Sequence, residues 1–238
     1  MKLIKFLHKW LSLLVALQVL IWLGSGLFFN LMDHNKARGN TYRAQVDNNI
    51  AILPASLLAP KTVLQQQDKP VNSLKLISLL SQPYYLLNHK ESLYPHFYNQ
   101  HSLINAFTGE VKIIDNVFVQ ALAKATYSGN GEIKSVEKLM PPIADFLKEK
   151  NQLWQVNFAD ELNTSVYFDV GSGRLIGHCN DDKRFVDFFF MLHFMDYGSL
   201  GGFNHWQTIF FALITLLFSM TGFIWTMELL KNGRYKIR

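Results

Sequence analysis

Eight histidines and one cysteine are the side chains through which this sequence could bind a metal or relay a proton. The imidazole ring is a common nitrogen ligand of transition metals, and it titrates near neutral pH. Four of the histidines adjoin long apolar stretches, namely His8, His34, His193 and His205. No Ser-His-Asp order, P-loop, Rossmann fingerprint or HExxH helix is present, so the sequence gives no support to a hydrolase or a nucleotide-driven enzyme.

The cysteine content and the charge distribution exclude other classes of site. A single cysteine, Cys179, cannot form an intramolecular disulfide or a cysteine-based zinc or iron–sulfur centre. The formal net charge is +5, but residues 33–204 carry 16 Lys and Arg against 17 Asp and Glu. The excess positive charge therefore lies at the two ends of the chain, and the nearly neutral middle argues against a nucleic-acid-binding face.

Two uncharged stretches, residues 10–32 and 205–227, must position the neighbouring histidines. Each is 23 residues long, and about 20 apolar residues suffice to cross the ~30 Å hydrocarbon layer of a bilayer. The alternative for the first stretch is a cleaved signal peptide. That stretch is longer than the usual apolar region of a signal peptide, and no small-x-small cleavage site follows it. We therefore predict two transmembrane helices.

Basic residues flank the two predicted spans on the same side of the membrane. Three lysines precede the first span, within residues 1–9, and four Lys and Arg follow the second, within residues 228–238. By the positive-inside rule both of these termini are cytoplasmic. The expected location is the bacterial inner membrane, crossed twice, with the central domain in the periplasm.

The central region contains two similar hairpins, at residues 105–115 and 166–178. In each, two short extended segments flank a tight turn, and the turn glycines Gly109 and Gly173 are 64 residues apart. A turn that needs positive φ explains a glycine at each position. The spacing therefore predicts an internal repeat.

A predicted helix precedes each hairpin, at residues 51–67 and 116–126. Extended segments follow these helices, at 73–80 and 84–88 in the first copy and at 132–139 and 152–158 in the second. Each copy then consists of a helix followed by an antiparallel meander. The alternative is one irregular α+β domain in which the hairpins are coincidental.

The predicted fold class is an α+β membrane protein, in which two transmembrane helices flank a periplasmic domain of two helix-plus-antiparallel-sheet units. The first unit covers residues 33–115 and the second covers 116–182. Residues 183–204 form a juxtamembrane helix and connector, with the helix expected at 183–197. Because this helix is apolar on most sides, it should lie on the membrane surface or support the domain.

Several segments resemble the PepSY-associated transmembrane family. The opening LHKWLSLLVALQVLIWLGSG is similar to the first membrane helix of that family, and the TGE and GSGR hairpins resemble the Asp-x-x-Thr-Gly-x-hydrophobic ending of PepSY units. The join MLHFMDYG, followed by FNHWQ and FSMTGFIW, resembles the passage from the last PepSY unit into the next span. The resemblance covers nearly the whole chain and implies that the two units are PepSY-like.

The resemblance also implies iron chemistry. Larger members of the family have four spans, bind b-type haem and reduce ferric siderophores, and small two-span iron-uptake members are linked to ferric reduction that feeds ferrous iron transporters. This chain would then pass electrons to periplasmic ferric iron, with haem b as cofactor and iron as substrate. The sequence has no flavin or nicotinamide site, so a separate electron donor is expected.

Three histidines are the candidate haem ligands: His8, His193 and His205. A neutral imidazole donates a lone pair to haem iron, and its other N–H can be fixed by a neighbouring acceptor. His8 and His205 lie at opposite ends of the spans, about 30 Å apart in depth, so they cannot bind one iron. A haem at His8 would take its second ligand from a second protomer, whereas His193 and His205 could converge through the glycine-containing connector. The alternative for each histidine is an interfacial anchor that hydrogen-bonds lipid phosphate or backbone.

Four further histidines are candidates for binding ferric iron directly: His34, His89, His96 and His101. The stretch from His89 to His101 also contains carboxylate and phenol oxygens, which suit ferric iron. His178 and Cys179 adjoin two aspartates and form a similar oxygen-rich patch. The alternative is that these histidines are merely solvated and that Cys179 is a buried, inert thiol.

The expected partners are a second copy of the chain in a homodimer, the lipid bilayer and, indirectly, a ferrous iron transporter or an electron donor. Small residues at 24–26 and 219–222 would allow close contact between the spans of a homodimer. No nucleic-acid partner is expected. Two other functions stay open: a non-catalytic periplasmic PepSY binding or regulatory module, and an accessory subunit of a larger membrane complex.

Overall fold

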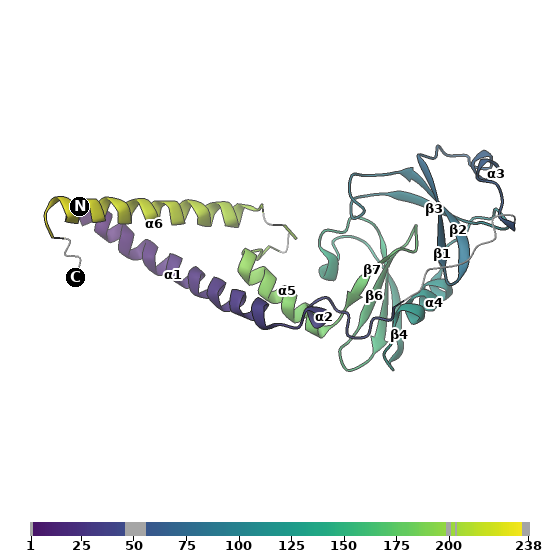
Figure 1. Ribbon diagram of the computed structural model, residues 1–238, viewed down its shortest axis with the longest axis horizontal. Coiled ribbons are helices and arrows are strands. Elements are labelled where there is room, and N and C mark those ends of the chain that lie inside the picture. Colours follow the sequence, from purple (N-terminus) through teal and green to yellow (C-terminus); the bar gives the residue numbers. More distant parts are fainter. Residues whose placement is uncertain (1, 46–55, 199–200, 203, 235–238) are drawn as a thin grey trace. The chain divides into compact units, whose positions relative to one another are not determined.

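The computed structural model contains two long apolar helices near the ends of the chain and two antiparallel sheets between them (Figure 1). It describes residues 2–45, 56–198, 201–202 and 204–234. The chain divides into two compact units. We call Met1–Met32 with Val186–Arg238 the helix unit, and Asp33–Phe185 the sheet unit. The predicted α+β class with an apolar helix toward each end is confirmed.

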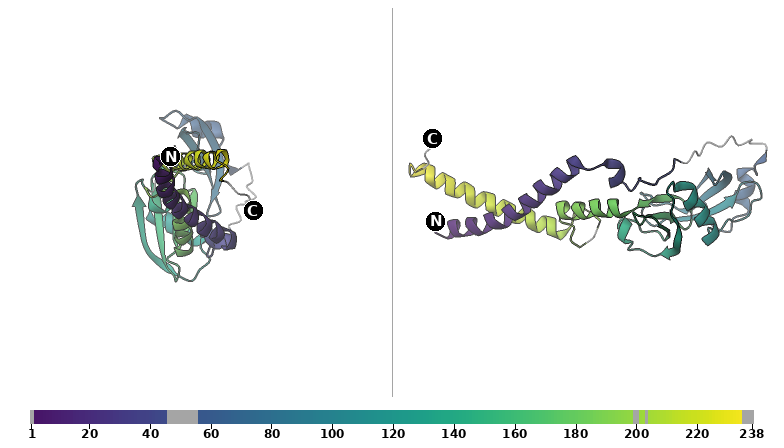
Figure 2. Two further views of the ribbon diagram at one scale, coloured as in Figure 1. Left: turned by 90° about the vertical axis from the view of Figure 1, so that its left-hand side faces the viewer. Right: turned by 90° about the horizontal axis from the view of Figure 1, so that it is seen from below.

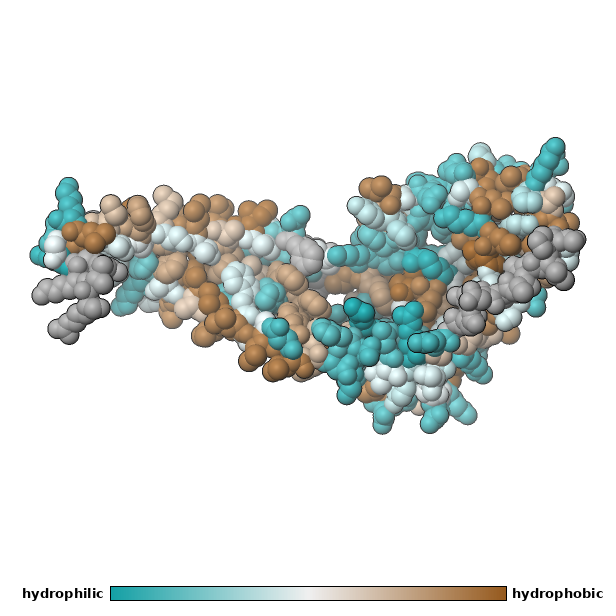
Figure 3. All heavy atoms as spheres, in the orientation of Figure 1, coloured by the Kyte–Doolittle hydropathy of each residue, from teal (hydrophilic) through white to brown (hydrophobic). Residues whose placement is uncertain are grey.

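The helix unit is built on α1 (Lys2–Leu31) and α6 (Trp206–Lys231). Both helices are long and apolar enough to cross a membrane, and most of their large apolar side chains are exposed (Figure 3). The predicted spans 10–32 and 205–227 largely coincide with them, but each helix continues toward the basic end of the chain. The two helices run in opposite directions and cross (Figure 2).

A small apolar cluster joins α1 to α6. Val15, Met195 and Phe211 are buried together in it, and partly buried side chains surround them, namely Trp22, Ile214 and Phe218. The rings of Trp22 and Phe211 meet edge to face with centroids 5.6 Å apart. Such a pair contributes about 0.5–1.5 kcal/mol beyond the area it buries, so it helps to fix the register of the two helices.

In the sheet unit each sheet follows a helix and forms an antiparallel meander. The first set is α3 (Pro60–Gln65), β1 (Ser73–Leu79), β2 (Gln82–Lys90) and β3 (Gln100–Asn105), paired in the order β1-β2-β3. The second is α4 (Asn116–Thr126), β4 (Glu132–Leu139), β5 (Leu153–Ala159), β6 (Ser165–Asp169) and β7 (Leu175–Cys179), paired in sequence order. The remaining elements are α2 (His34–Ala37), a 3-10 helix (Ala144–Phe146) and α5 (Asp181–Phe194).

The hairpins around Gly109 and Gly173 are built by the same hydrogen bonds. Asn105 and Asp169 each begin a turn, and a side-chain oxygen of each accepts the N–H groups two and three residues later. The N–H of each glycine donates to the carbonyl of that first residue, and the two φ angles are +77° and +68°. Such φ values favour glycine because it has no Cβ. The two segments are therefore equivalent in structure as well as in sequence.

One apolar core is shared by both sheets and by α4. Its buried members are Tyr84, Leu103, Ile114, Val119, Leu122, Ala123, Trp154, Val156, Phe158, Val166 and Phe168. A second cluster joins Val63 of α3 to the other face of the first sheet, and a third covers the other face of the second sheet. The two meanders therefore form one compact unit.

Several element boundaries differ from the sequence prediction. α4 has the predicted bounds, and Asp115 caps it by accepting the N–H of Phe118 at 2.8 Å. The helix predicted at 51–67 is short in the described region, because it begins at Pro60 and ends at Gln65; residues 51–55 lie outside the described residues. The helix predicted at 183–197 begins at Asp181 and ends at Phe194, because Met195 has a φ of +54°.

Candidate functional site

His8 lies in the helix unit at the contact between α1 and α6. Its ring stacks on Phe218 with centroids 4.6 Å apart, and it meets Trp225 edge to face at 5.6 Å. Gly222 makes room for this ring, since a Cβ at that position would lie 2.9 Å from Cε1 of His8. Gly222, expected to face a second protomer, is therefore used for packing within one protomer.

Hydrogen bonding determines which ring nitrogen of His8 carries the proton. The hydroxyl of Thr221 donates its one hydrogen to the carbonyl of Phe218, 2.8 Å away. Nδ1 of His8 lies 3.1 Å from that hydroxyl oxygen, so with the hydroxyl hydrogen on the carbonyl of Phe218 it is Nδ1–H that donates. In the neutral ring Nε2 then carries the lone pair, and among the described residues it has no hydrogen-bond partner.

His193, near the end of α5, repeats this arrangement against α1. The hydroxyl of Ser25 donates to the carbonyl of Ile21 at 2.7 Å, and Nδ1 of His193 lies 2.8 Å from Ser25 Oγ. Nδ1–H is again the donor and Nε2 again carries the lone pair. The indole Nε1 of Trp22 also donates to the backbone carbonyl of His193 at 2.7 Å. Both the ring and the main chain of His193 are thus held by α1.

This shared arrangement is the one that a metal-bound imidazole requires. A ligating histidine normally donates its second N–H to a fixed acceptor, which sets the ring orientation and raises the basicity of the ligating nitrogen. Here the acceptor is a helix hydroxyl whose own hydrogen is bonded to a carbonyl of the preceding turn. His8 and Ser25 are 17 residues apart on α1, about 25 Å at ~1.5 Å per residue, so the two imidazoles form separate sites.

His205 has a different role in the helix unit. It is the N-cap of α6, is buried, and its Nδ1 accepts the backbone N–H of Thr208 at 3.4 Å. The lone pair of this ring is therefore on Nδ1 and is engaged at the start of the helix. No ring contact joins His205 to His193 among the residues described.

The histidines predicted as direct iron ligands are dispersed in the sheet unit. His34 is exposed in α2, and the ring of His96 stacks on Tyr94 at 5.5 Å. Both ring nitrogens of His89 are engaged, since Nδ1–H donates to the carbonyl of Pro70 at 2.9 Å and Nε2 accepts from Ser102 at 2.8 Å. In the described part of the chain no three His, Cys, Asp or Glu side chains come together as a metal site.

His101 lines a cavity of about 420 Å³ in the sheet unit. Its Nδ1–H donates to Oδ1 of Asn88, and burial lowers its pKa, so the ring is neutral with the lone pair on Nε2. Lys75, Glu91 and Arg174 also line the cavity. Sequence analysis named His101 and the stretch that contains Glu91, but it could not bring Lys75 and Arg174 beside them, because these come from β1 and from the hairpin between β6 and β7.

The oxygen-rich patch expected around His178 and Cys179 does not form, because both side chains are buried. Nε2–H of His178 donates to Thr126 Oγ1 at 3.2 Å, since that hydroxyl donates to the carbonyl of Ala123. Nδ1 of His178 has no partner among the described residues, and burial lowers the pKa of the ring to about 4. Burial raises the pKa of the Cys179 thiol to about 12, which makes it unreactive.

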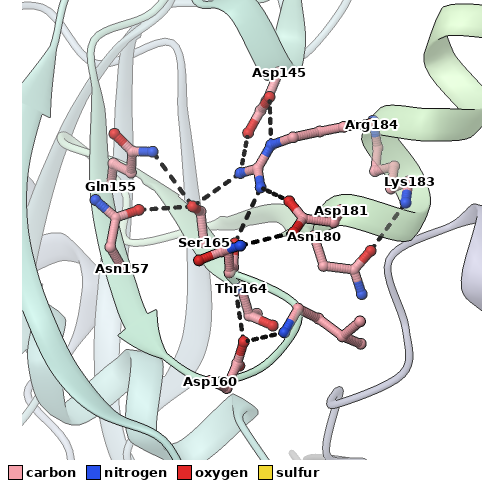
Figure 4. Close-up of polar contacts among 12 residues, drawn as sticks. Asp145, Gln155, Asn157, Asp160, Thr164, Ser165, Asn180, Asp181, Lys183 and Arg184 are labelled. Carbon is pink, nitrogen blue, oxygen red and sulfur yellow. Dashed lines mark hydrogen bonds and ion pairs between the residues drawn. The ribbon is translucent and has the colours of Figure 1, made fainter.

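A polar network on the second sheet holds the first turn of α5 (Figure 4). Arg184 forms an ion pair with Asp145 at 2.9 Å and donates to Ser165 Oγ at 3.1 Å and to the carbonyl of Asn163 at 3.0 Å. The hydroxyl of Tyr167 donates to the same carboxylate at 2.7 Å. Burial opposes ionisation of Asp145, but the hydrogen bonds from Arg184 and Tyr167 outweigh it and keep its pKa below the usual value. This network fixes the first turn of α5 on the second sheet.

Gln18 is a further buried polar side chain that sequence analysis missed. It lies within α1, and its Nε2 has no hydrogen-bond partner in the described region. Its signal in the sequence was a single amide in a run of apolar residues. We assign it no ligand.

Known proteins provide no match in which His8 and His193 have counterparts. No protein family, curated protein or solved structure matches this chain. The resemblance to the PepSY-associated transmembrane family therefore stays a prediction, and so do the ligands and the cofactor that it implies. What can be said of the candidate site rests on the hydrogen bonds of His8 and His193.

Proposed function

We propose that this chain is a two-span protein of the bacterial inner membrane that passes electrons to periplasmic ferric iron through b-type haem, and so supplies ferrous iron for uptake. The observation that carries the proposal is the pair His8 and His193, in each of which Nδ1 is hydrogen-bonded to a helix hydroxyl and Nε2 has no partner among the described residues. The length and apolar character of α1 and α6 support the membrane location. The basic ends of the chain support cytoplasmic termini and a periplasmic sheet unit.

The residues of both sites fit an axial haem ligand. Haem iron binds the lone pair of a neutral imidazole, and Thr221 and Ser25 supply the acceptor that the second ring nitrogen needs. When bound, haem would supply one-electron transfer between a donor and ferric iron. Each site contributes one imidazole, so a haem held by two imidazoles would take the other one from a partner protomer. This requirement supports a homodimer.

Of the three predicted ligands, His205 fits this role least well. Its lone pair lies on Nδ1 and accepts the N–H of Thr208, which stabilises the first turn of α6. Ligation of iron through Nδ1 would remove that cap. We therefore propose His8 and His193 as ligands and His205 as a cap.

The reduced-minus-oxidised visible spectrum of the detergent-purified full chain tests the haem proposal. We expect a Soret band in the wild type and its loss or strong reduction in His8→Ala and in His193→Ala. His205→Asn is the matched control, because asparagine also caps a helix, and it should keep the band. Thr221→Val and Ser25→Ala should keep the band but shift the reduction potential, since they remove only the acceptor for Nδ1–H.

Two results would overturn the haem proposal. The first is a wild-type protein purified from haem-replete cells without haem absorption. The second is a pair of alanine variants at His8 and His193 that keep the wild-type spectrum and still raise ferrous iron outside the inner membrane.

Membrane orientation has its own test. Reporter fusions at Arg238 should behave as cytoplasmic, and fusions near Gly129 should behave as periplasmic. The opposite pattern would overturn the orientation and leave the membrane location in place.

The cavity at His101 favours a second candidate function, a non-catalytic periplasmic binding module. Lys75 and Arg174 give its wall two cations, of which Arg174 is paired with Glu149, and Glu91 adds a carboxylate; Nε2 of His101 is free to ligate the iron of a chelate. These groups suit a small polar anion, such as a ferric chelate with carboxylate arms. Ferric citrate is the probe: the full chain should bind it, and His101→Leu should weaken binding while His89→Leu does not. Equal binding by all three proteins would dismiss this candidate.

A further inference from the structure

The C-terminal half of α5 packs along the C-terminal end of α1 in the helix unit. Two stacked phenyl pairs join the helices, with ring centroids 4.0 Å apart for Phe28–Phe189 and 4.6 Å apart for Phe29–Phe190. One turn later, His193 donates to Ser25. As α5 advances from residue 189 to 193, its partners on α1 move back from residue 28 to 25. The two segments are therefore antiparallel.

If the hydrocarbon layer extends to the end of α1 at Leu31, these contacts define how far the end of α5 lies below the membrane surface. Ser25 is six residues before Leu31, which is about 9 Å along the helix. Trp22, which donates to the carbonyl of His193, is nine residues before Leu31, about 13 Å. The end of α5 therefore lies below the end of the span, inside the hydrocarbon layer.

α6 begins too far below the membrane surface to pack against the last turn of α1. Phe211 of α6 contacts Trp22, and α6 begins five residues earlier, at Trp206, about 7 Å along the helix. The last turn of α1, from Phe28 onward, thus extends past the start of α6. α5 takes the neighbouring position there.

The charged residues of α5 stop where, by these contacts, the helix enters the hydrocarbon layer. All five charged residues of the helix lie in its first half, namely Asp181, Asp182, Lys183, Arg184 and Asp187. The seven residues that follow, 188–194, read FFFMLHF. The side chain of Phe188 is 49% exposed, and that of Phe190 stays 40% exposed although one side of its ring stacks on Phe29. An uncharged segment with exposed phenyl rings needs an apolar surrounding.

The end of α5 has the hydrogen bonds that a helix terminus in hydrocarbon requires. Away from water, each unpaired carbonyl costs several kcal/mol. The N–H of Asp196 donates to the carbonyl of Met191 at 3.0 Å, and the positive φ of Met195 completes a Schellman turn. The carbonyl of His193 accepts from Trp22. Met195 is buried in the cluster with Val15 and Phe211, which explains a bulky residue at a position that favours glycine.

We propose that residues 188–194 of α5 form a membrane-inserted segment ahead of α6, in which Phe188 and the exposed part of Phe190 contact lipid acyl chains in the outer leaflet. The exposed phenyl rings continue the lipid-facing surface of α1. This inference rests on the proposed crossing of the membrane by α1 and α6. It places His193 within the hydrocarbon layer, where a bound cofactor is shielded from bulk water.

Site-directed spin labelling of the full chain in phosphatidylcholine vesicles tests the proposal. Single cysteines are introduced as Phe188→Cys and Phe190→Cys, with Leu17→Cys and Leu213→Cys as span references and Val117→Cys as an aqueous reference, all five exposed in the structure. Native Cys179 is buried and supplies the blank. Relaxation by oxygen reports contact with lipid, and relaxation by a water-soluble nickel chelate reports contact with water. We expect labels at 188 and 190 to behave as those in the spans, with high oxygen and low nickel accessibility.

The other outcomes each overturn a different statement. Nickel accessibility at 188 and 190 equal to that at 117, with the span references still protected, would overturn the membrane insertion of α5 alone. Low accessibility to both reagents would mean that protein covers the face, and it would overturn the lipid contact. Nickel accessibility at 17 and 213 would overturn the membrane crossing on which the proposal rests.

Discussion

Lowering the pH should favour opening of the second sheet at His178. This effect should begin at a higher pH than the protonation of the carboxylates of the sheet unit. The ring is 2% exposed, its Nε2–H donates to Thr126, and its Nδ1 has no partner among the residues described. Protonation would place a second N–H and a positive charge in this buried position, with the charge of Arg43 opposing it. The folded protein therefore disfavours the charged ring.

The sign and size of the effect follow from the two pKa values of His178. Burial lowers the pKa in the folded protein to about 4, against 6.5 for an unperturbed ring. Between these two pH values the unfolded chain binds more protons than the folded chain. The free energy of unfolding is therefore highest above pH 6.5 and decreases as the pH drops toward 4. The complete loss is about 3 kcal/mol. Relative to pH 8, the population of the opened state should rise about tenfold at pH 5.5 and about 70-fold at pH 4.5.

The neighbouring thiol supplies the assay. Cys179 is the one cysteine of the chain and has no exposed surface, so it reacts only when β7 opens. Its rate of reaction with a pyridyl disulfide that stays reactive below neutral pH is divided by the rate of a free thiol peptide at each pH. The corrected rate reports the opening equilibrium of the full chain in detergent.

His178→Gln is the matched variant, because its side-chain N–H can still donate to Thr126 but cannot titrate. The corrected rate of this variant should stay nearly flat between pH 7 and 4.5. The pKa of His101 is also lowered by burial and acts in the same direction, so His101→Asn should keep most of the wild-type slope. A wild-type slope that His178→Gln leaves unchanged would refute the assignment to His178.

Three further predictions concern the stability of the sheet unit and are measured by urea denaturation of the full chain in detergent. Arg184→Met leaves the carboxylate of Asp145 without its ion-pair partner and should lower the free energy of unfolding by about 2 kcal/mol; a change near zero would show that solvent replaces the guanidinium. Gly39→Ala should lower the free energy of unfolding by about 2 kcal/mol or more, because φ is +70° and the new Cβ would lie 2.5 Å from a backbone carbonyl oxygen; an unchanged value would show that the backbone relaxes. Tyr127→Phe keeps the ring that stacks on Phe158 but removes a hydroxyl bonded to Asp160 and to the N–H of Gly131, and it should cost about 1 kcal/mol; no loss would mean that water satisfies both partners.

The elements that sequence analysis located well are those specified by local pattern. The apolar stretches at 10–32 and 205–227 led directly to α1 and α6, and the helix predicted at 116–126 has the bounds of α4. Gly109 and Gly173 marked turns because only glycine takes their φ without strain. Each of these signals lies within a few residues of the structure it specifies.

The hydrogen-bond partners and the tautomer of each histidine could not be predicted, because they depend on residues that are distant in the sequence. His8 meets Thr221 from 213 positions away, and His193 meets Ser25 from 168 positions away. The tautomer of each ring then depends on a second bond, from the hydroxyl to a carbonyl of its own helix. No periodicity or spacing in the sequence reports such a pair of bonds.

The repeated hairpins show why a sequence motif alone does not locate function here. Asn105 and Thr108 form the first turn near the surface, whereas Asp169 and Ser172 form the second turn in a buried position. The hydrogen bonds are the same in both surroundings, so they serve the backbone of the turn and need no ligand to explain them. His8 and His193 differ in this respect, because each holds its ring in place through Nδ1 and leaves Nε2 without a partner in the described chain. A fixed ring with an unpaired lone pair next to an apolar phase is an arrangement that folding alone does not require, and it is the reason to seek the chemistry of this protein in its helix unit.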